Sequence, residues 1–152
     1  MKTIGYAAHS TDAHMVPYHF ERRALRANDV AIEILYSGIC HSDLHTVNGD
    51  WGPQPYPLVP GHEIVGRVID VGSDVKKYKT GDNVAVGCMV DSCQDCDQCH
   101  NHEEQFCRNG LTPTYGAPDR IDGTTTQGGY SKHIVVREEF VLSVPEKLDL
   151  SR

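Results

Sequence analysis

Four cysteines that lie within fifteen residues constrain the fold of this chain more than any other feature of its sequence. Cys93, Cys96, Cys99 and Cys107 follow the spacing C-x2-C-x2-C-x7-C. The short gaps let successive thiolates converge on one point, and the longer return brings the fourth sulfur round to complete a tetrahedron. Zinc suits four thiolates in this geometry, so we predict that the segment is a loop folded around one Zn²⁺ ion.

Two other uses of these cysteines remain open at this point. The run C-x2-C-x2-C also occurs in ferredoxins, although the x3-C-P continuation of their cluster motif is absent here. Disulfides are the second alternative, but the amino end MKTIGYAAHSTD lacks the apolar stretch of a secretory signal, and cytosolic thiols stay reduced. We therefore expect a cytoplasmic protein. A zinc ion with four cysteine ligands has no open position for a substrate, so this loop should stabilise the structure rather than catalyse a reaction.

The charge of the chain argues against two classes of partner. Its 152 residues include 14 Lys and Arg against 21 Asp and Glu, a net charge of −7, and the basic residues form no run. A chain of this kind is not expected to bind nucleic acid or an anionic membrane. No window approaches the roughly 18 consecutive apolar residues of a membrane-spanning helix. We therefore expect no nucleic acid and no membrane among its partners.

Short β-type runs recur along the chain between Gly, Asn and Asp turn signals. Many of their apolar residues alternate with small or charged ones, which is typical of strands with one buried face. The expected strands are Thr3–Ala8, Val30–Gly38, Glu63–Gly72, Asp82–Val90, Tyr130–Val136 and Phe140–Pro145. We predict a mainly β fold, an antiparallel barrel or sandwich, with a helical turn near His41–Val47 and another in the cysteine loop. Cys88, inside an apolar run, is expected to be a buried thiol.

A second group of potential metal ligands lies upstream of the cysteine loop. Cys40 and the pair His62-Glu63 offer one thiolate, one imidazole and one carboxylate. An open catalytic zinc site uses three protein ligands and leaves the fourth position to water or substrate. Taken alone, these residues carry no local spacing rule, and a lone Cys or His is more often a buried structural residue. Composition therefore leaves the structural interpretation ahead of the metal site.

Four motifs in their order along the chain give a more specific indication. CHSDLH begins at Cys40, GHE-x2-G begins at Gly61, the four-cysteine loop follows, and QGGY begins at Gln127. From about Thr3 to Pro145 the chain resembles the zinc-containing medium-chain alcohol dehydrogenases. Within that family it is most similar to the cinnamyl-alcohol-dehydrogenase-like branch, which includes broad-specificity aldehyde reductases. Two cysteines and one histidine are the known catalytic zinc ligands of alcohol dehydrogenases.

This resemblance implies a fold, a cofactor and a set of site residues. The fold is a GroES-like, partly open β-barrel with a few short helices and a zinc-binding loop, a catalytic domain over residues 1–152. The metals are a structural zinc at the cysteine loop and a catalytic zinc bound by Cys40 and His62, with Glu63 directly behind it. The second cofactor is NAD(P), and the substrate is a small alcohol or aldehyde.

The remaining roles implied by the resemblance concern protons and the cofactor. Asp43 matches the carboxylate that fixes the tautomer and tilt of His62. Ser42 and His45 match a relay that carries the proton of the alcohol to solvent, for which imidazole is suited because it titrates near neutral pH. His41 matches a contact with the cofactor pyrophosphate. Zinc would act as a Lewis acid on the alcohol oxygen, and hydride would pass to the nicotinamide.

Cofactor binding needs residues that these 152 positions do not supply. No G-x-G-x-x-G follows an expected strand, and relatives place a third cysteine ligand and a nucleotide-binding domain beyond the position of Arg152. We therefore expect the catalytic domain only, inactive by itself in hydride transfer. A non-catalytic, zinc-binding GroES-like module and a redox or zinc-storage protein are the alternatives, but neither needs the relay residues. The choice between NAD and NADP, the substrate and any homo-oligomer stay open.

Overall fold

The computed structural model describes residues 1–151 and is built mainly of strands. The strands are β1 (Lys2–Ala7), β2 (Val16–Glu21), β3 (Asp29–Gly38), β4 (Glu63–Val71), β5 (Asn83–Val86), β6 (Met89–Asp91), β7 (Thr112–Pro113), β8 (His133–Arg137) and β9 (Val141–Ser143). The helices are short: α1 (His41–Asn48), α2 (Asp97–His100), and the 3-10 turns η1 (Glu104–Phe106) and η2 (Glu138–Phe140). This composition confirms the predicted mainly β fold.

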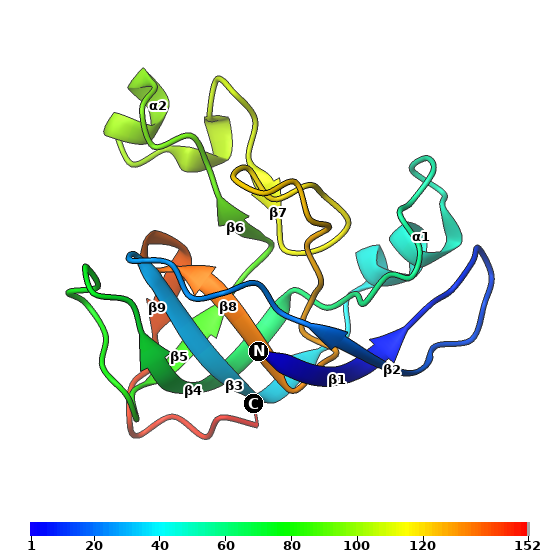
Figure 1. The fold of residues 1–152 in the computed structure, drawn as a ribbon, viewed down its shortest axis with the longest axis horizontal. Helices are drawn as coiled ribbons and strands as arrows, with labels where there is room; N and C mark the ends of the chain where they lie inside the picture. Colours follow the sequence, from blue (N-terminus) through cyan, green and yellow to red (C-terminus); the bar gives the residue numbers. More distant parts are fainter. Residues whose placement is uncertain (152) are drawn as a thin grey trace.

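A curled sheet of five strands forms the body of the molecule (Figure 1). Its order is β8-β3-β4-β5-β9, and every neighbouring pair is antiparallel. The β3–β4 register shifts between Ala31 and Ile32 and again between Ile34 and Tyr36. Bulges of this kind bend a strand and increase its twist, so the long β3 and β4 strands curl the sheet. β8 and β9 stay at opposite ends of the strand order, which makes a partly open barrel.

The core lies on the inner face of this curled sheet. The alternation seen in the sequence of β3 and β4 places Val30, Ile32, Ile64 and Val68 there, each at most 2% exposed. Phe140 and the inward residues of β5, β8 and β9 complete the same cluster. Burial of each such side chain contributes about 1.5–3 kcal/mol. The sheet that carries the candidate site is therefore held by its own core.

One expected strand is divided, and one expected burial is wrong. The run Asp82–Val90 forms β5 and β6, because the chain leaves the main sheet between them. At this bend the hydroxyl of Thr114 donates to the carbonyl of Gly87 over 2.6 Å, and the Thr114 amide donates to the carbonyl of Cys88 over 3.2 Å. The backbone of Cys88 is thus bound, but its side chain is exposed rather than buried.

The other expected elements are close to those observed, and two strands were not predicted. An observed strand overlaps each of the predicted ranges Thr3–Ala8, Val30–Gly38, Glu63–Gly72, Tyr130–Val136 and Phe140–Pro145, with one or both ends shifted. The helix predicted near His41–Val47 is α1, which ends at Gly49 in the left-handed conformation that favours glycine. β2 contains a proline and pairs only with β1, and β7 has two residues. Neither gives a clear strand signal in sequence.

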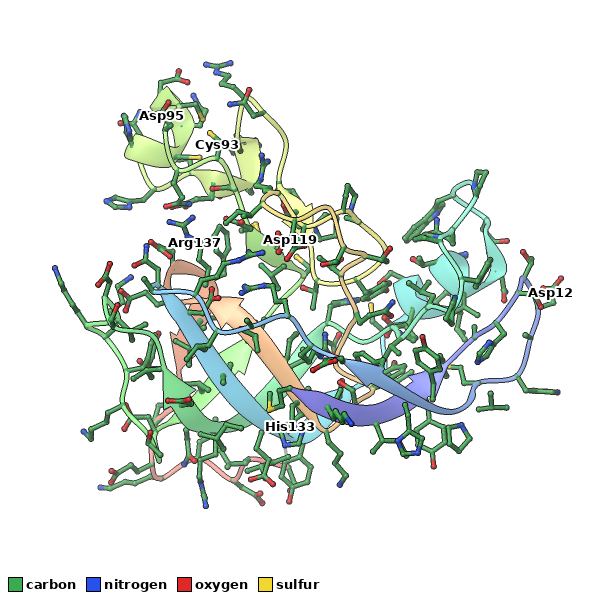
Figure 2. The ribbon with its side chains drawn as sticks, viewed as in Figure 1. Asp12, Cys93, Asp95, Asp119, His133 and Arg137 are labelled. Atoms are coloured by element: carbon green, nitrogen blue, oxygen red, sulfur yellow. The ribbon has the colours of Figure 1, made fainter. Side chains whose placement is uncertain are left out.

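The cysteine loop projects from the body as a separate lobe (Figure 1). It extends from the small β6–β7 sheet and contains α2 and η1. Ion pairs connect the base of this lobe to the body. Nη1 of Arg137 is 3.6 Å from Oδ1 of Asp91, and the guanidinium of Arg26 donates two hydrogen bonds to the carboxylate of Asp119, over 2.9 and 3.0 Å. Figure 2 shows Cys93 in the lobe and both Arg137 and Asp119 between the lobe and the sheet. None of the helices within residues 1–151 has the length and apolar character needed to cross a membrane.

Candidate metal centres

The four sulfur atoms of the cysteine loop lie together, as the spacing predicted. Sγ of Cys99 is 3.8 Å from Sγ of Cys93 and 3.5 Å from Sγ of Cys96, and all four sulfurs are within 4.8 Å of one another. These separations are too long for a disulfide, in which the sulfurs are about 2.05 Å apart. A tetrahedron with a zinc–sulfur distance of about 2.3 Å has sulfurs about 3.8 Å apart. The four thiols therefore fit a tetrahedral metal site.

Backbone amides of the same loop point at its sulfurs. The Cys93 amide donates to Sγ of Cys107, and the Arg108 amide donates to Sγ of Cys96, each over 3.4 Å. A backbone hydrogen bond from Asp95 lowers the pKa of Cys93 to about 6. The amides of Arg108 and Cys99 likewise lower the pKa of Cys96. Donors that stabilise thiolates suit a metal ligand set, because metals bind the deprotonated sulfur.

The second cluster is assembled by the pairing of β3 with β4. Cys40 follows the end of β3, and His62 precedes the start of β4. Because Gly38 pairs with Glu63 in this ladder, the two flanking residues come together although they are distant in sequence. One ligand atom from each of Cys40, His62 and Glu63 lies within 4.8 Å of the other two. Thiolate, imidazole and carboxylate together are a donor set that fits Zn²⁺.

Asp43 lies beside the imidazole of His62. Its Oδ1 atom is 3.3 Å from Nδ1 of His62, and its side chain is buried. Asp43 is also the third residue of α1, so it reaches back to the helix start, where the Cys40 amide donates to its Oδ2 over 3.0 Å. The start of α1 thus connects both candidate ligands through one carboxylate.

Three further donors surround the Asp43 carboxylate. The Gly61 amide and the hydroxyl of Tyr115 donate to Oδ1 over 3.1 and 2.6 Å, and the hydroxyl of Tyr130 donates to Oδ2 over 2.7 Å. Burial by itself would raise the pKa of Asp43, but these hydrogen bonds outweigh it and lower the pKa. Burial and the bond to Asp43 raise the pKa of Tyr115 and of Tyr130, so both hydroxyls stay protonated donors.

Sequence reasoning assigned no role to either tyrosine. Tyr130 belongs to the QGGY motif, which supported the resemblance, but the motif does not tell where its hydroxyl points. Tyr115 lies in the long loop between β7 and β8 and carries no motif. The close approach of Tyr130 requires Gly61, because an added Cβ there would overlap the tyrosine ring, and the φ of Gly61 is +100°. The glycine before His62 was therefore the feature of the sequence that could have indicated a close contact at this position.

The predicted relay residues lie one turn apart on α1. The hydroxyl of Ser42 donates to Sγ of Cys40 over 3.1 Å, so Ser42 lies at the second cluster. Nδ1 of His45 is 2.7 Å from Oδ2 of Asp50, and its ring lies 5.1 Å from that of Trp51. His41 is exposed at the first turn, its ring 5.0 Å from that of His45. The structure thus places Ser42 at the candidate ligands and the two histidines nearer to solvent.

Residues 26–146 match the protein family described as "Alcohol dehydrogenase GroES-like domain". The "Probable mannitol dehydrogenase 1" of Stylosanthes humilis is 52% identical over 149 residues, which are 98% of this chain and 41% of that protein. The "NADP-dependent alcohol dehydrogenase C 1" of Mycolicibacterium smegmatis is 53% identical over 152 residues, 99% of this chain and 43% of the relative. The chain thus spans about two fifths of the length of these relatives.

Solved structures show the same similarity. The cinnamyl alcohol dehydrogenase (CAD) from Helicobacter pylori, described as complexed with NADP(H), superposes with a TM-score of 0.95 at 46% identity, covering 99% of this chain and 43% of the other. The cinnamyl alcohol dehydrogenase SbCAD4 from Sorghum bicolor gives a TM-score of 0.93 at 45% identity, covering 99% and 42% of the two chains. These likenesses confirm the predicted resemblance and the GroES-like, partly open barrel.

Proposed function

The chain belongs to the alcohol dehydrogenase GroES-like domain family, and from this premise we propose that it is the zinc-binding catalytic domain of an enzyme that interconverts alcohols and aldehydes with NAD(P)(H). The observation that carries the proposal is the second cluster, where Cys40, His62 and Glu63 converge beside the buried carboxylate of Asp43. A purely structural zinc site is closed by four protein ligands, whereas here two half-buried ligands and one exposed carboxylate leave a position open.

Each residue of the second cluster has a chemical task in this proposal. Cys40 and His62 would hold a zinc ion, which when bound supplies a Lewis acid to the substrate oxygen. Oδ1 of Asp43 lies 3.3 Å from Nδ1 of His62, where a carboxylate would favour a proton on Nδ1 and leave Nε2 free to act as a ligand. Glu63 adds a negative charge beside the two ligands.

Proton transfer would follow α1 toward solvent. The Ser42 hydroxyl, which lies at Sγ of Cys40, would accept the proton of a bound alcohol and pass it on. His45 is partly exposed and bound to Asp50, so it can exchange a proton with water. The exposed His41 would contact the cofactor phosphates. The names of the relatives support NADP as the cofactor and an alcohol as the substrate of the whole protein.

The four-cysteine loop would hold a second, structural zinc. We infer a cytoplasmic location, because four thiolate ligands require a compartment that keeps cysteines reduced. Hydride transfer by the 152-residue chain alone should be undetectable, since no stretch of it supplies a G-x-G-x-x-G phosphate site.

A chimera tests the catalytic proposal directly. The chain would replace the matching segment of the Mycolicibacterium relative, with which it aligns over 152 residues. The chimera should reduce an aromatic aldehyde with NADPH, and the change His62→Ala should abolish turnover while cofactor binding remains. A folded chimera that binds zinc and NADPH but has no turnover would contradict the proposal and favour a non-catalytic zinc module.

A further inference from the structure

Two tyrosine hydroxyls from separate loops converge on Asp43. The hydroxyl of Tyr115 bonds to Oδ1 over 2.6 Å, and the hydroxyl of Tyr130 bonds to Oδ2 over 2.7 Å. Each carboxylate oxygen therefore has one phenol and one backbone amide as donors. With both oxygens held in this way, the carboxylate cannot rotate without breaking four hydrogen bonds to a charged group, which are the stronger kind.

Tyr115 also contacts His62 directly. The two rings are stacked at an angle of 29°, with centroids 5.9 Å apart. Tyr115 thus limits the tilt of the imidazole from one side while its hydroxyl holds the carboxylate that faces Nδ1. One side chain therefore restrains both partners of the Asp43–His62 contact.

Tyr130 is held in register with the segment that leads into His62. The Tyr130 amide donates to the carbonyl of Pro60 over 2.9 Å, and the Gly129 amide donates to the carbonyl of Gly61 over 2.8 Å. These bonds fix the distance between the tyrosine backbone and the loop before His62. The QGGY motif therefore positions a phenol at the site, a role that the catalytic proposal does not use.

We propose that Tyr115 and Tyr130 are positioning residues of the Cys40–His62 centre, which hold the Asp43 carboxylate beside Nδ1 of His62. The consequence is a single imidazole tautomer and tilt, with Nε2 directed at the metal. This inference rests on the proposed function, because it assigns a purpose to the Asp43–His62 contact. Partners of a ligating histidine are known to change metal affinity by about 10–100-fold when they are lost.

The test uses the changes Tyr115→Phe and Tyr130→Phe, singly and together, in the full 152-residue chain. Tyr78→Phe is the matched control, because the Tyr78 hydroxyl likewise makes a hydrogen bond, to the carbonyl of Val141 on β9, but its ring packs against the core cluster of the sheet. The control should lose this one hydrogen bond without affecting the site. If the double variant does not fold, the two single variants carry the test.

Two measurements are made on each variant. A long-range ¹H–¹⁵N correlation spectrum of the metal-free chain reports the tautomer of His62, whose signals are assigned by their loss in His62→Ala. Competition with a zinc indicator reports the affinity of each metal site, and the four-cysteine loop serves as an internal reference.

The wild-type spectrum should show the Nδ1–H tautomer of His62, and the double variant should show a mixture. The zinc affinity that depends on His62 should fall about threefold in each single variant and about tenfold or more in the double variant. The affinity of the cysteine loop, and both readouts in Tyr78→Phe, should stay unchanged. A double variant with the wild-type tautomer and affinity within about twofold would overturn the proposal. If the wild type bound no zinc through His62, the proposed function would fail, and the tautomer would still decide the positioning role.

Discussion

The change Asp43→Asn should destabilise the chain far more than the exchange of one oxygen for an amide group suggests. Asp43 is 2% exposed and accepts four hydrogen bonds, two from backbone amides and two from tyrosine hydroxyls. Asparagine keeps one acceptor oxygen, but its NH₂ group must face the other pair of donors. If the oxygen takes the Oδ1 position, the Gly61 and Tyr115 bonds survive, and the Cys40 amide is left facing a donor.

The size of the effect follows from these contacts. A hydrogen bond to a charged acceptor contributes about 1.5–3 kcal/mol, and a neutral one about 1, so two surviving bonds lose about 1–4 kcal/mol together. The orphaned Cys40 amide costs a further 1–3 kcal/mol or so. The hydroxyl of Tyr130 does not add the cost of an unpaired donor, because it can rotate to accept a hydrogen bond from the new NH₂ group. The free energy of unfolding should therefore fall by about 2–7 kcal/mol, out of a typical total of about 5–15.

Urea denaturation of the metal-free chain, followed by circular dichroism, measures this difference. Asp50→Asn is the control, since the Asp50 side chain is exposed and, among the contacts described, bonds to the His45 ring alone, so the loss of its charge should cost less than about 1 kcal/mol. An Asp43→Asn variant within about 1 kcal/mol of the wild type, with an unchanged slope in urea, would refute the reasoning. The buried carboxylate would then not be the centre of the site's hydrogen bonds.

Three further changes test other parts of the structure. Cys107→Ser should reduce the zinc content of the purified chain by one ion, as counted by elemental analysis, whereas Cys88→Ser, at an exposed thiol outside the cluster, should not change it. Burial would raise the pKa of Asp119, but its pairing with Arg26 lowers the pKa to about 2. The free energy of unfolding should therefore decrease as pH falls from about 4 to about 2, and this decrease should be smaller in Asp119→Asn when stability is measured against pH. Gly129→Ala should cost about 1–3 kcal/mol in thermal or urea unfolding, because the new methyl group would overlap Ile64, whereas Gly87→Ala meets no atom within 4 Å and should cost less than about 1.

The cysteine loop could be predicted from sequence because its geometry is local. Four ligands within fifteen residues leave few ways to arrange the chain, and the sulfurs of Cys93, Cys96, Cys99 and Cys107 converge as the spacing indicated. The strands β3 and β4 could be predicted equally well, because the alternation of apolar residues along each strand indicates one buried face. Short-range rules of this kind need no knowledge of the rest of the fold.

The second cluster depends on long-range pairing that spacing rules do not describe. Cys40 and His62 meet because the end of β3 is paired with the start of β4, in a ladder with two register shifts. Nothing in the composition fixes that register, so a family resemblance had to supply the ligand set. The role of Tyr115 could not be predicted from the sequence, since the residue lies 72 positions from Asp43 in a loop that carries no motif. Cys88 failed for a related reason, because its apolar run concealed the bend at which the chain leaves the sheet.

Different interactions stabilise the structure of the two candidate metal centres. Between Cys93 and Cys107 only Cys99 and Cys107 are buried, and α2 and η1 have four and three residues, too few to be stable helices alone. The lobe therefore lacks an apolar core, and a metal would supply much of the free energy that folds it. The Cys40–His62 cluster is held instead by the pairing of β3 with β4 and by the protein's own hydrogen bonds around Asp43. Because the sheet and these bonds position the candidate ligands, a metal there need not supply the free energy of folding, and its binding can serve chemistry.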